Sequence, residues 1–340
     1  MMTGRERILS ALEHKKTDCL PLMPITMMLA ADEIGVPYGR YATDARLLCQ
    51  GQVAIAEHFG FDYVSVISDP GVESGDCGAS IIYYENQPPA VDEKNALLAD
   101  KSRLASLKPP APHSGRRMSN RIEGVRLLKE KAGKDLLVEG WVEGPTAESA
   151  DLRGINHLMI DFIDDPDFVK ELFAFVYELA MPFARAQVEA GADIIGVGDA
   201  ASSLVGPSIY EEFVWEYQKK WNDGIHAMGA KTRLHICGNT TANLAMIGKL
   251  GYDMVDLDWM VSVAEARKQM GPDQVLLGNI DPVRVLFSGT PEIVLREIEK
   301  CYQEAGSNYI VGAGCEVPRG TPEENLLALS RFAKETRPGV

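Results

Sequence analysis

The chain has 340 residues, of which 46% are hydrophobic and 24% charged, and its formal net charge is −15. This length and composition are ordinary for a water-soluble globular protein of one or two domains. The negative charge argues against nucleic acid as a main partner, because a phosphate backbone requires a basic surface, and it also argues against an anionic membrane surface. No apolar run approaches the roughly 20 residues that span a bilayer, and the charged N-terminal helix is unlike a signal peptide. Six irregularly spaced cysteines indicate reduced thiols in a cytoplasmic protein.

The first third of the chain contains two predicted strands and a long excursion. Residues 3–13 form a predicted helix, with Thr3 as its cap and Glu6 completing a capping box. Predicted strands follow at 19–25 and 61–68, separated by a helix at 43–59. Residues 71–92 leave the regular pattern and include an expected hairpin arm at 79–85, so they are expected to form an insertion over one rim of the fold.

From residue 135 onward, short apolar strands alternate with helices. The expected strands are 135–142, 192–197, 232–237, 254–258, 274–277 and 307–311, and the expected helices are 117–132, 166–190, 208–228, 241–250, 261–270, 290–305 and 322–335. Such alternation predicts a parallel sheet. Eight strands in this length predict a (β/α)8 TIM barrel, with an N-terminal helical extension and an insertion after strand 2, in a single domain over 1–340. The competitor is a doubly wound open sheet, but no G-x-G-x-x-G or P-loop turn is present.

Residues 234–240, Leu-His-Ile-Cys-Gly-Asn-Thr, carry the strongest chemical signal. His235 and Cys237 lie two apart on a predicted strand, so their side chains point to the same face. Cys315 follows the eighth predicted strand, and the active sites of barrels lie at the carboxyl ends of the strands. Imidazole and thiolate are ligands that zinc prefers, and three protein ligands leave a fourth position open for chemistry. The alternative is a buried histidine beside two inert buried cysteines.

These residues carry a resemblance. The pattern His-x-Cys-Gly-Asn-Thr-Thr at 235–241, the run Gly-Asn-Ile-Asp-Pro at 278–282, and Gly-Cys at 314–315 followed by Gly-Thr-Pro-Glu-Glu-Asn at 320–325 resemble the uroporphyrinogen decarboxylase superfamily. Within it, the chain resembles the cobalamin-dependent methyltransferases of the methylcobalamin:coenzyme M type. The resemblance extends over essentially the whole chain. It implies a TIM barrel whose zinc, held by the matching His235, Cys237 and Cys315, binds and activates a thiol.

Other polar residues at strand ends are candidates for supporting roles. In the enzymes that the chain resembles, an acidic residue after the next strand can fill the fourth zinc position; Asp258 is the best match and Asp256 the second, although either could cap a helix. Asp199 could orient His235 or line the pocket, and Asn279 could contact substrate or corrinoid. Trp141 and Glu143 are weaker substrate-binding candidates. The aromatic residues of 208–228 are expected to be packing residues, and His157 and His226 structural or surface residues.

The function expected from the resemblance is methyl transfer between a methylcobalamin, carried on a corrinoid protein, and a thiol such as coenzyme M. A partner corrinoid protein is implied because the chain lacks an Asp-x-His-x-x-Gly cobalamin motif. The ligand set does not choose a direction, so the reverse reaction, loading a corrinoid protein from a methyl donor, stays open. A zinc-stabilised binding subunit is a third reading. A sulfonate would need a cationic clamp, for which Arg153 and Arg319 are candidates by loop position only.

The superfamily's decarboxylase activity is the main enzymatic rival. Its substrate carries many carboxylates, and the family supplies arginines around the first strand to bind them. Here residues 21–28 contain no arginine, and the next one is Arg40. An acidic protein with this gap is poorly suited to a polyanionic tetrapyrrole, so the decarboxylase reading is disfavoured.

Overall fold

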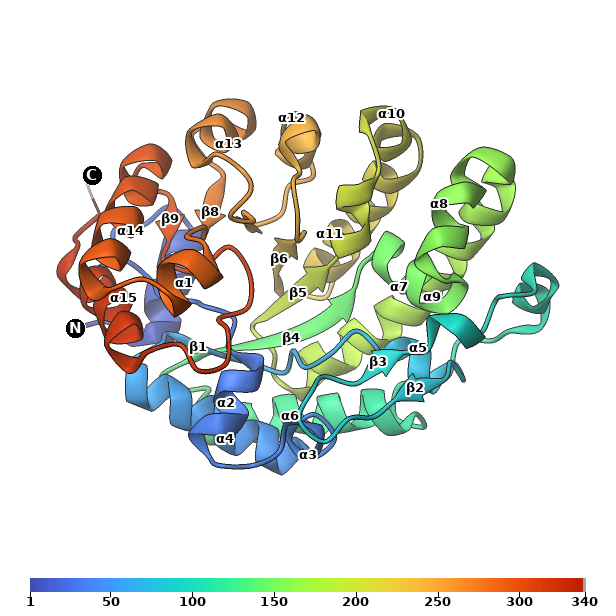
Figure 1. Cartoon of the computed structure of the whole chain (residues 1–340), viewed down its shortest axis with the longest axis horizontal. Coiled ribbons are helices and arrows are strands. Elements are labelled where there is room, and N and C mark those ends of the chain that lie inside the picture. The colour runs from blue at the N-terminus through green and yellow to red at the C-terminus, as the bar shows by residue number, and fades with distance from the viewer. Residues whose placement is uncertain (339–340) are drawn as a thin grey trace.

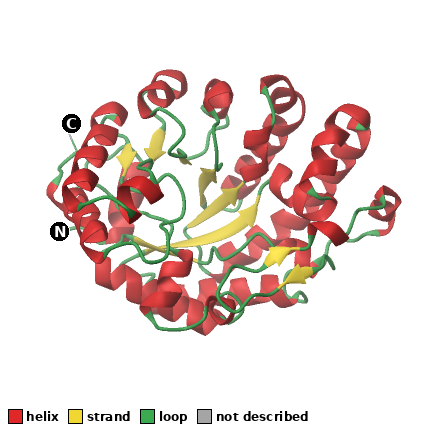
Figure 2. Ribbon diagram, in the orientation of Figure 1, coloured by secondary structure: helices red, strands yellow, loops and turns green. Residues whose placement is uncertain are grey.

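The computed structural model describes residues 1–338. Its centre is a curled parallel sheet of seven strands in the order β1-β4-β5-β6-β7-β8-β9, with helices around the outside (Figures 1 and 2). The strands are β1 (Tyr63–Ser65), β4 (Leu137–Glu143), β5 (Ile194–Gly198), β6 (Lys231–His235), β7 (Met254–Asp256), β8 (Val275–Leu277) and β9 (Tyr309–Ile310). The predicted α/β architecture with a parallel sheet is confirmed, and the fold resembles a TIM barrel.

Helices connect successive strands, as a parallel sheet requires. They are α1 (Gly4–Leu12), α2 (Met27–Glu33), α3 (Tyr38–Tyr41), α4 (Ala45–Phe59), α5 (Glu73–Asp76), α6 (Arg116–Lys131), α7 (Pro145–Arg153), α8 (Ile155–Asp164), α9 (Pro166–Ala190), α10 (Pro207–Ile209), α11 (Trp215–Ala227), α12 (Leu244–Ile247), α13 (Val263–Met270), α14 (Pro291–Ala305) and α15 (Glu323–Glu335). The capping box predicted at Thr3 and Glu6 is present. Helix α9 has its predicted bounds and ends at Gly191, whose φ of 115° favours glycine.

The first predicted strand, 19–25, is wrong as a regular strand. In this segment only Leu22 pairs, through one parallel bridge to Val311 beyond β9. Pro21 and Pro24 have no backbone N–H to donate, so they interrupt the ladder of hydrogen bonds that a strand needs. The sheet therefore has seven strands where the sequence predicts eight, with this segment lying against the last strand.

The predicted excursion after the second strand contains a short hairpin. Strand β2 (Ile81–Ile82) pairs with β3 (Ala90–Val91) in an antiparallel manner, outside the main sheet. The aromatic side chains at its tip, Tyr83 and Tyr84, are exposed. The hairpin and helix α5 lie beyond the end of β1, on the same side of the fold as the carboxyl ends of the strands (Figure 1).

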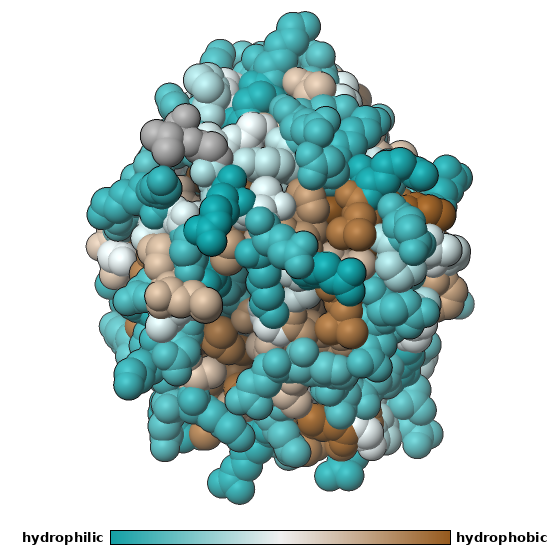
Figure 3. Space-filling view, turned by 90° about the vertical axis from the view of Figure 1, so that its left-hand side faces the viewer, coloured by the Kyte–Doolittle hydropathy of each residue, from teal (hydrophilic) through white to brown (hydrophobic). Residues whose placement is uncertain are grey.

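The interior is filled by apolar side chains of the strands and of the inner helix faces. A large apolar cluster lies between the sheet and its helices, and a smaller one fills the sheet interior near the amino ends of the strands. The view toward the C-terminal helices shows a mostly hydrophilic surface with small apolar patches (Figure 3). Among residues 1–338, no helix combines the length and apolar character needed to cross a membrane.

Candidate metal centre

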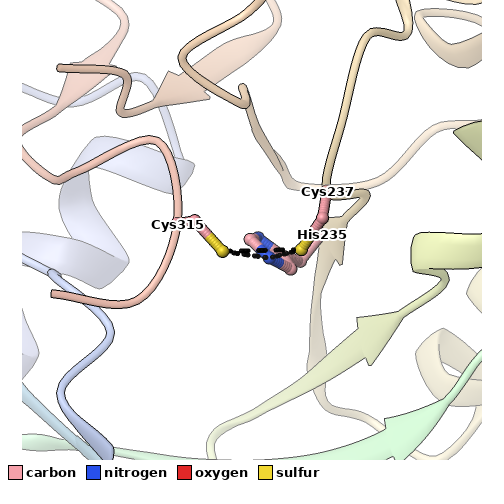
Figure 4. Close-up of side chains that lie close together, drawn as sticks. All are labelled: His235, Cys237 and Cys315. Carbon is pink, nitrogen blue, oxygen red and sulfur yellow. Dashed lines mark hydrogen bonds between the residues drawn. The ribbon is translucent and has the colours of Figure 1, made fainter. Parts of the chain in front are cut away.

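His235 and Cys237 are presented by the end of strand β6. His235 is the last residue of β6 and pairs with Gly198 of β5. The chain then leaves the sheet, and Gly238 takes a φ of 96° that allows the turn directly after Cys237. Because strand side chains alternate, His235 and Cys237 project to the same side (Figure 4).

Cys315 approaches from the far end of the sheet. Beyond β9, Ala313 bridges to Ile280, and the Gly314 N–H donates to the Ile280 carbonyl at 3.0 Å. A Cβ on Gly314 would lie 2.3 Å from the Trp259 nitrogen, so only glycine permits this close approach to the loop after β7. These contacts bring Cys315 over the end of β6 (Figure 4).

The three side chains form one compact cluster. His235 Nε2 lies 3.0 Å from Cys237 Sγ, the two sulfur atoms are 3.5 Å apart, and Cys315 Sγ lies 4.0 Å from His235 Nε2. Within residues 1–338, this is the one group of three or more His, Cys, Asp or Glu side chains whose ligand atoms all lie within 4.8 Å of one another. One imidazole and two thiols match the ligand set of a zinc site with an open fourth position.

The electrostatics of the sulfur pair also favour a cation. The pKa of Cys315 is lowered, because Cys237 and His235 offer hydrogen bonds to its sulfur, whereas the pKa of Cys237 is raised by the same sulfur contact and by burial. One thiolate is therefore favoured and a second is opposed, since two like charges at this separation repel. A metal ion between the sulfurs would remove that opposition.

Asp256, at the end of β7, fixes the orientation of His235. Its Oδ2 lies 2.8 Å from His235 Nδ1, so Nδ1 carries the shared proton and Nε2 faces the sulfurs. Burial lowers the pKa of His235, but Asp256 and Cys315 outweigh it and raise the value to about 9. A carboxylate on the outer nitrogen of a metal-binding histidine is the usual arrangement.

Asp199 does not take this orienting role. Its buried carboxylate accepts hydrogen bonds from the N–H groups of Thr146 and Ala147 and from the Gln218 side chain, at 2.6–2.9 Å. It therefore anchors the start of helix α7, and the sequence-based suggestion that it orients His235 is corrected in favour of Asp256. Contact between Asp199 and substrate stays a prediction that these hydrogen bonds do not favour.

Asp258 lies beside the cluster, with its oxygens engaged by two loops. Oδ2 accepts from the Gly238 N–H at 2.8 Å and Oδ1 from the Met260 N–H at 2.9 Å. Its negative charge also contributes to raising the pKa of Cys237, which places the carboxylate near that sulfur. The fourth-ligand role stays a prediction, and the loop contacts support the alternative of a cap.

The Asn279 side chain is held by hydrogen bonds to the loop before α13 and to Cys301. Its side-chain nitrogen donates to the carbonyls of Asp258 and Val261 at 2.9 and 2.6 Å, and its oxygen accepts from the Cys301 thiol. These bonds tie strand β8 to the loop before α13. Contact between Asn279 and substrate or corrinoid stays a prediction.

Trp141 and Glu143, on strand β4, flank the cluster from the other side. The Trp141 ring lies 6.1 Å from the His235 ring, and its Nε1 donates to Glu143 Oε1 at 3.1 Å. Burial, together with Glu73 and Asp151, raises the pKa of Glu143 well above its usual value. Its carboxyl group is thus biased toward the uncharged form, which offers a proton donor instead of another negative charge beside the sulfurs.

Gly196 makes the position of Trp141 possible, which gives a testable expectation. A Cβ on Gly196 would lie 2.3 Å from the indole ring, so Gly196→Ala must displace Trp141 and should lower the free energy of unfolding by about 1–3 kcal/mol. Denaturant unfolding measures this change. Gly206→Ala, whose Cβ would meet no atom within 4 Å, is the matched control and should change stability by less than about 0.5 kcal/mol. Equal effects of the two substitutions would contradict the close packing of Trp141.

The two arginines suggested as a sulfonate clamp bind other groups, outside the cluster. Arg153 is buried and donates to Asp161 and to the carbonyls of Leu98 and Ala99. Arg319 pairs with Asp32. Neither lies in the cluster. As expected, His157 is exposed, and His226 contacts Asp253 at the edge of the fold.

Sequence reasoning missed Arg233, which lies two residues before His235 on β6 and binds the Asp256 carboxylate. It donates to Asp256 through Nε and Nη2 at 2.7–3.0 Å and to Glu139 through Nη1 at 3.0 and 3.2 Å. The available signal was a charged residue two positions before His235 on a predicted strand of the sheet. Such a residue points to the same interior face as His235 and must find buried partners.

Comparison with known proteins places this chain in a family. The uroporphyrinogen decarboxylase (URO-D) family model matches residues 3–336. The chain is 30% identical over 343 residues to the methylcobamide:CoM methyltransferase MtbA of Methanosarcina mazei, covering 98% of each chain, and 27% identical to MtaA of Methanosarcina barkeri, covering 96% of each. A uroporphyrinogen decarboxylase of Nocardia farcinica is 28% identical over 276 residues, which cover 79% of this chain and 75% of that enzyme.

Solved structures agree with the fold. A methyltransferase from Methanosarcina mazei superimposes with a TM-score of 0.90 at 24% identity, over 98% of this chain and 99% of that one. A B12-independent methionine synthase from Shewanella sp. gives a TM-score of 0.56 at 14% identity, covering 83% of this chain and 84% of that one. The family model over residues 3–336 shows that this chain belongs to the uroporphyrinogen decarboxylase family, and its identity over nearly the full length to the methylcobamide:CoM methyltransferases makes it a methyltransferase.

Proposed function

We propose that the chain transfers a methyl group between a methylated corrinoid and a small-molecule thiol such as coenzyme M, with zinc held by His235, Cys237 and Cys315. The observation that carries this proposal is the cluster of one imidazole and two thiols at the ends of β6 and β9. Relatives of nearly full length are methylcobamide:CoM methyltransferases, which supports a corrinoid and a thiol as the two substrates.

The cluster suits thiol activation. When bound, zinc lowers the pKa of a coordinated thiol so that it becomes a thiolate. Cys237 and Cys315 contribute two negative charges of their own, so a third sulfur at the site keeps nucleophilic character. In the proposed transfer, the substrate sulfur forms a bond to the methyl carbon as the cobalt–carbon bond breaks. The electron pair of that bond stays on cobalt, which changes from Co(III) to Co(I).

The chain's own residues would prepare the site for this transfer. Asp256 keeps Nε2 of His235 directed at the sulfurs. Trp141 offers an apolar ring beside His235, and the uncharged form of Glu143 offers a proton donor, so both remain proposed substrate contacts. Asp258 is proposed to leave its loop contacts and fill the fourth position when no thiol is present. The corrinoid is proposed to arrive on a separate protein.

We also infer the wider organisation from these contacts. The bridge between Leu22 and Val311 supports a closed barrel in which the segment around Leu22 takes the place of an eighth strand. The described residues 1–338 would then form one domain, with α1 as an N-terminal extension and the β2–β3 hairpin as an insertion, and the last two residues of the predicted domain lie outside the described residues. The six free cysteines are compatible with the proposed cytoplasmic location.

Anaerobic spectroscopy tests the proposed reaction. Zinc-loaded protein is incubated with methylcobalamin and, separately, with coenzyme M, cysteine or 2-mercaptoethanol, and formation of cob(I)alamin is followed by absorbance. We expect cob(I)alamin only when a competent thiol and the intact site are both present, and none with the Cys237→Ala variant. If no thiol changes the cobalamin spectrum, the proposal fails in this direction. The reverse transfer or a zinc-stabilised binding subunit would then be favoured.

A further inference from the structure

A chain of buried charges runs beneath the metal centre. Glu139 on β4 contacts Arg233 on β6, Arg233 contacts Asp256 on β7, and Asp256 contacts His235. The exposed fractions of these four side chains lie between 0% and 8%. Three strands thus contribute to one continuous line of hydrogen bonds that ends on a proposed metal ligand.

The sheet is built to let Arg233 reach both carboxylates. Arg233 and Asp256 lie on neighbouring strands, whereas Glu139 lies on β4, one strand beyond β5. On β5, the residue paired with Arg233 is Gly196, and a Cβ there would lie 3.3 Å from Glu139 Oε1 as well as against Trp141. The missing side chain at Gly196 therefore gives the guanidinium a path across β5 to Glu139.

We propose that Arg233, backed by Glu139, is a positioning residue for His235. This inference rests on the metal centre of the proposed function. Arg233 grips Asp256 with Nε and Nη2, and this two-point contact leaves the Asp256 carboxylate little freedom to rotate. Asp256 Oδ2 is thereby held on His235 Nδ1, and the imidazole ring presents Nε2 to the sulfurs. Glu139 completes the arrangement by taking the remaining nitrogen of the fork, so that the guanidinium itself cannot turn.

A purely structural role would not require this line of buried charged side chains. Taking three charged groups out of water is costly, and well-packed apolar residues of similar volume often stabilise a core as well as a buried ion pair does. The rest of the sheet interior is filled with apolar side chains such as Leu137, Met254 and Leu277. The charged layer adds a directed contact with His235 that apolar side chains could not make.

The test compares two arginine-to-lysine variants. Arg233→Lys keeps the charge but loses the planar two-point grip, so we expect the zinc dissociation constant, measured by chelator competition, to rise by about 10- to 100-fold. The absorption bands of the cobalt(II)-substituted protein should shift or broaden as His235 loses its fixed orientation. Arg7→Lys is the matched control, because Arg7 pairs with Asp18 and Asp62 before the start of β1, at the opposite end of the strands. It should lower stability while leaving zinc affinity and the cobalt spectrum unchanged.

The outcomes separate this inference from the proposed function. If Arg233→Lys loses no more zinc affinity than Arg7→Lys and gives an unchanged cobalt spectrum, the positioning role is overturned. Should Arg233→Lys fail to fold, Asp256→Asn and Glu139→Gln replace it. The inference then requires a loss of zinc affinity in both, larger for Asp256→Asn, and it is overturned if both keep the affinity of the native protein. Native protein that binds zinc but never demethylates methylcobalamin would contradict the proposed reaction and leave the positioning role intact.

Discussion

Cys315→Ala is expected to lower the affinity for zinc by more than about 100-fold, because it removes a ligand outright, whereas loss of an outer contact already costs 10- to 100-fold. Cys315 is the one member of the cluster that comes from the far end of the sheet, so His235 and Cys237 alone cannot enclose an ion. Metal content after dialysis and chelator competition measure the loss. Thiol-dependent demethylation of methylcobalamin should disappear in the same variant.

Cys49→Ala is the matched control for this substitution. Cys49 is a buried free thiol on helix α4, outside the cluster, and its replacement removes a sulfur of the same kind. We expect this variant to lose some stability from the smaller side chain and to retain zinc and activity. Full zinc occupancy in Cys315→Ala would contradict the metal centre, and equal zinc loss in both variants would point to a general effect on folding.

Arg233→Leu is expected to lower the free energy of unfolding by about 3–5 kcal/mol, because it leaves Glu139 and Asp256 without their cation in the sheet interior. Denaturant unfolding of the metal-free protein isolates this effect from any change in zinc binding. Burial alone would raise the pKa of Asp256, and Arg233 is the main group that holds it below its usual value. Removing Arg233 therefore opposes the ionised form of Asp256 most strongly.

An exposed arginine pair provides the comparison. Arg126 on helix α6 pairs with Glu123 and Glu130, and all three side chains are largely exposed. Such surface pairs contribute about 0–1 kcal/mol, so Arg126→Leu should change stability little. An equally small loss in the free energy of unfolding for Arg233→Leu and Arg126→Leu would contradict this expectation. It would mean that water or rearranged side chains compensate the charges of the buried carboxylates.

The metal cluster could be predicted from sequence, whereas its support could not. His235 and Cys237 were brought together by strand alternation alone, and Cys315 by its place after the last strand together with the family resemblance. Which carboxylate reaches His235 depends on the pairing of β6 with β7, where His235 lies opposite Asp256. Sequence does not give that register, so the sequence favoured Asp258 over Asp256 as the fourth ligand and suggested Asp199 as the residue that orients His235.

No helix is predicted between residues 143 and 165, where the structure has α7 and α8, and this omission has a local cause. Helix α7 is buried on nearly every side, so its apolar and polar residues show little of the periodicity that marks a surface helix. Helix α8 follows directly after Gly154, whose φ of 87° turns the chain between the two. Long helices with one solvent-exposed face, such as α9, were predicted correctly because their apolar residues recur with helical spacing in the sequence.

The single bridge between Leu22 and Val311 has a consequence for how the chain folds. Two backbone hydrogen bonds, from Met23 to Val311 and from Val311 to Pro21, join the beginning of the chain to its end. Closing so long a loop has a large entropic cost and little local gain, so this contact depends on the rest of the sheet being in place. We expect this contact between the segment around Leu22 and Val311 to form last during folding and to break first on heating. Cys315, which follows Val311 by four residues, would then be the first metal ligand to separate from the other two.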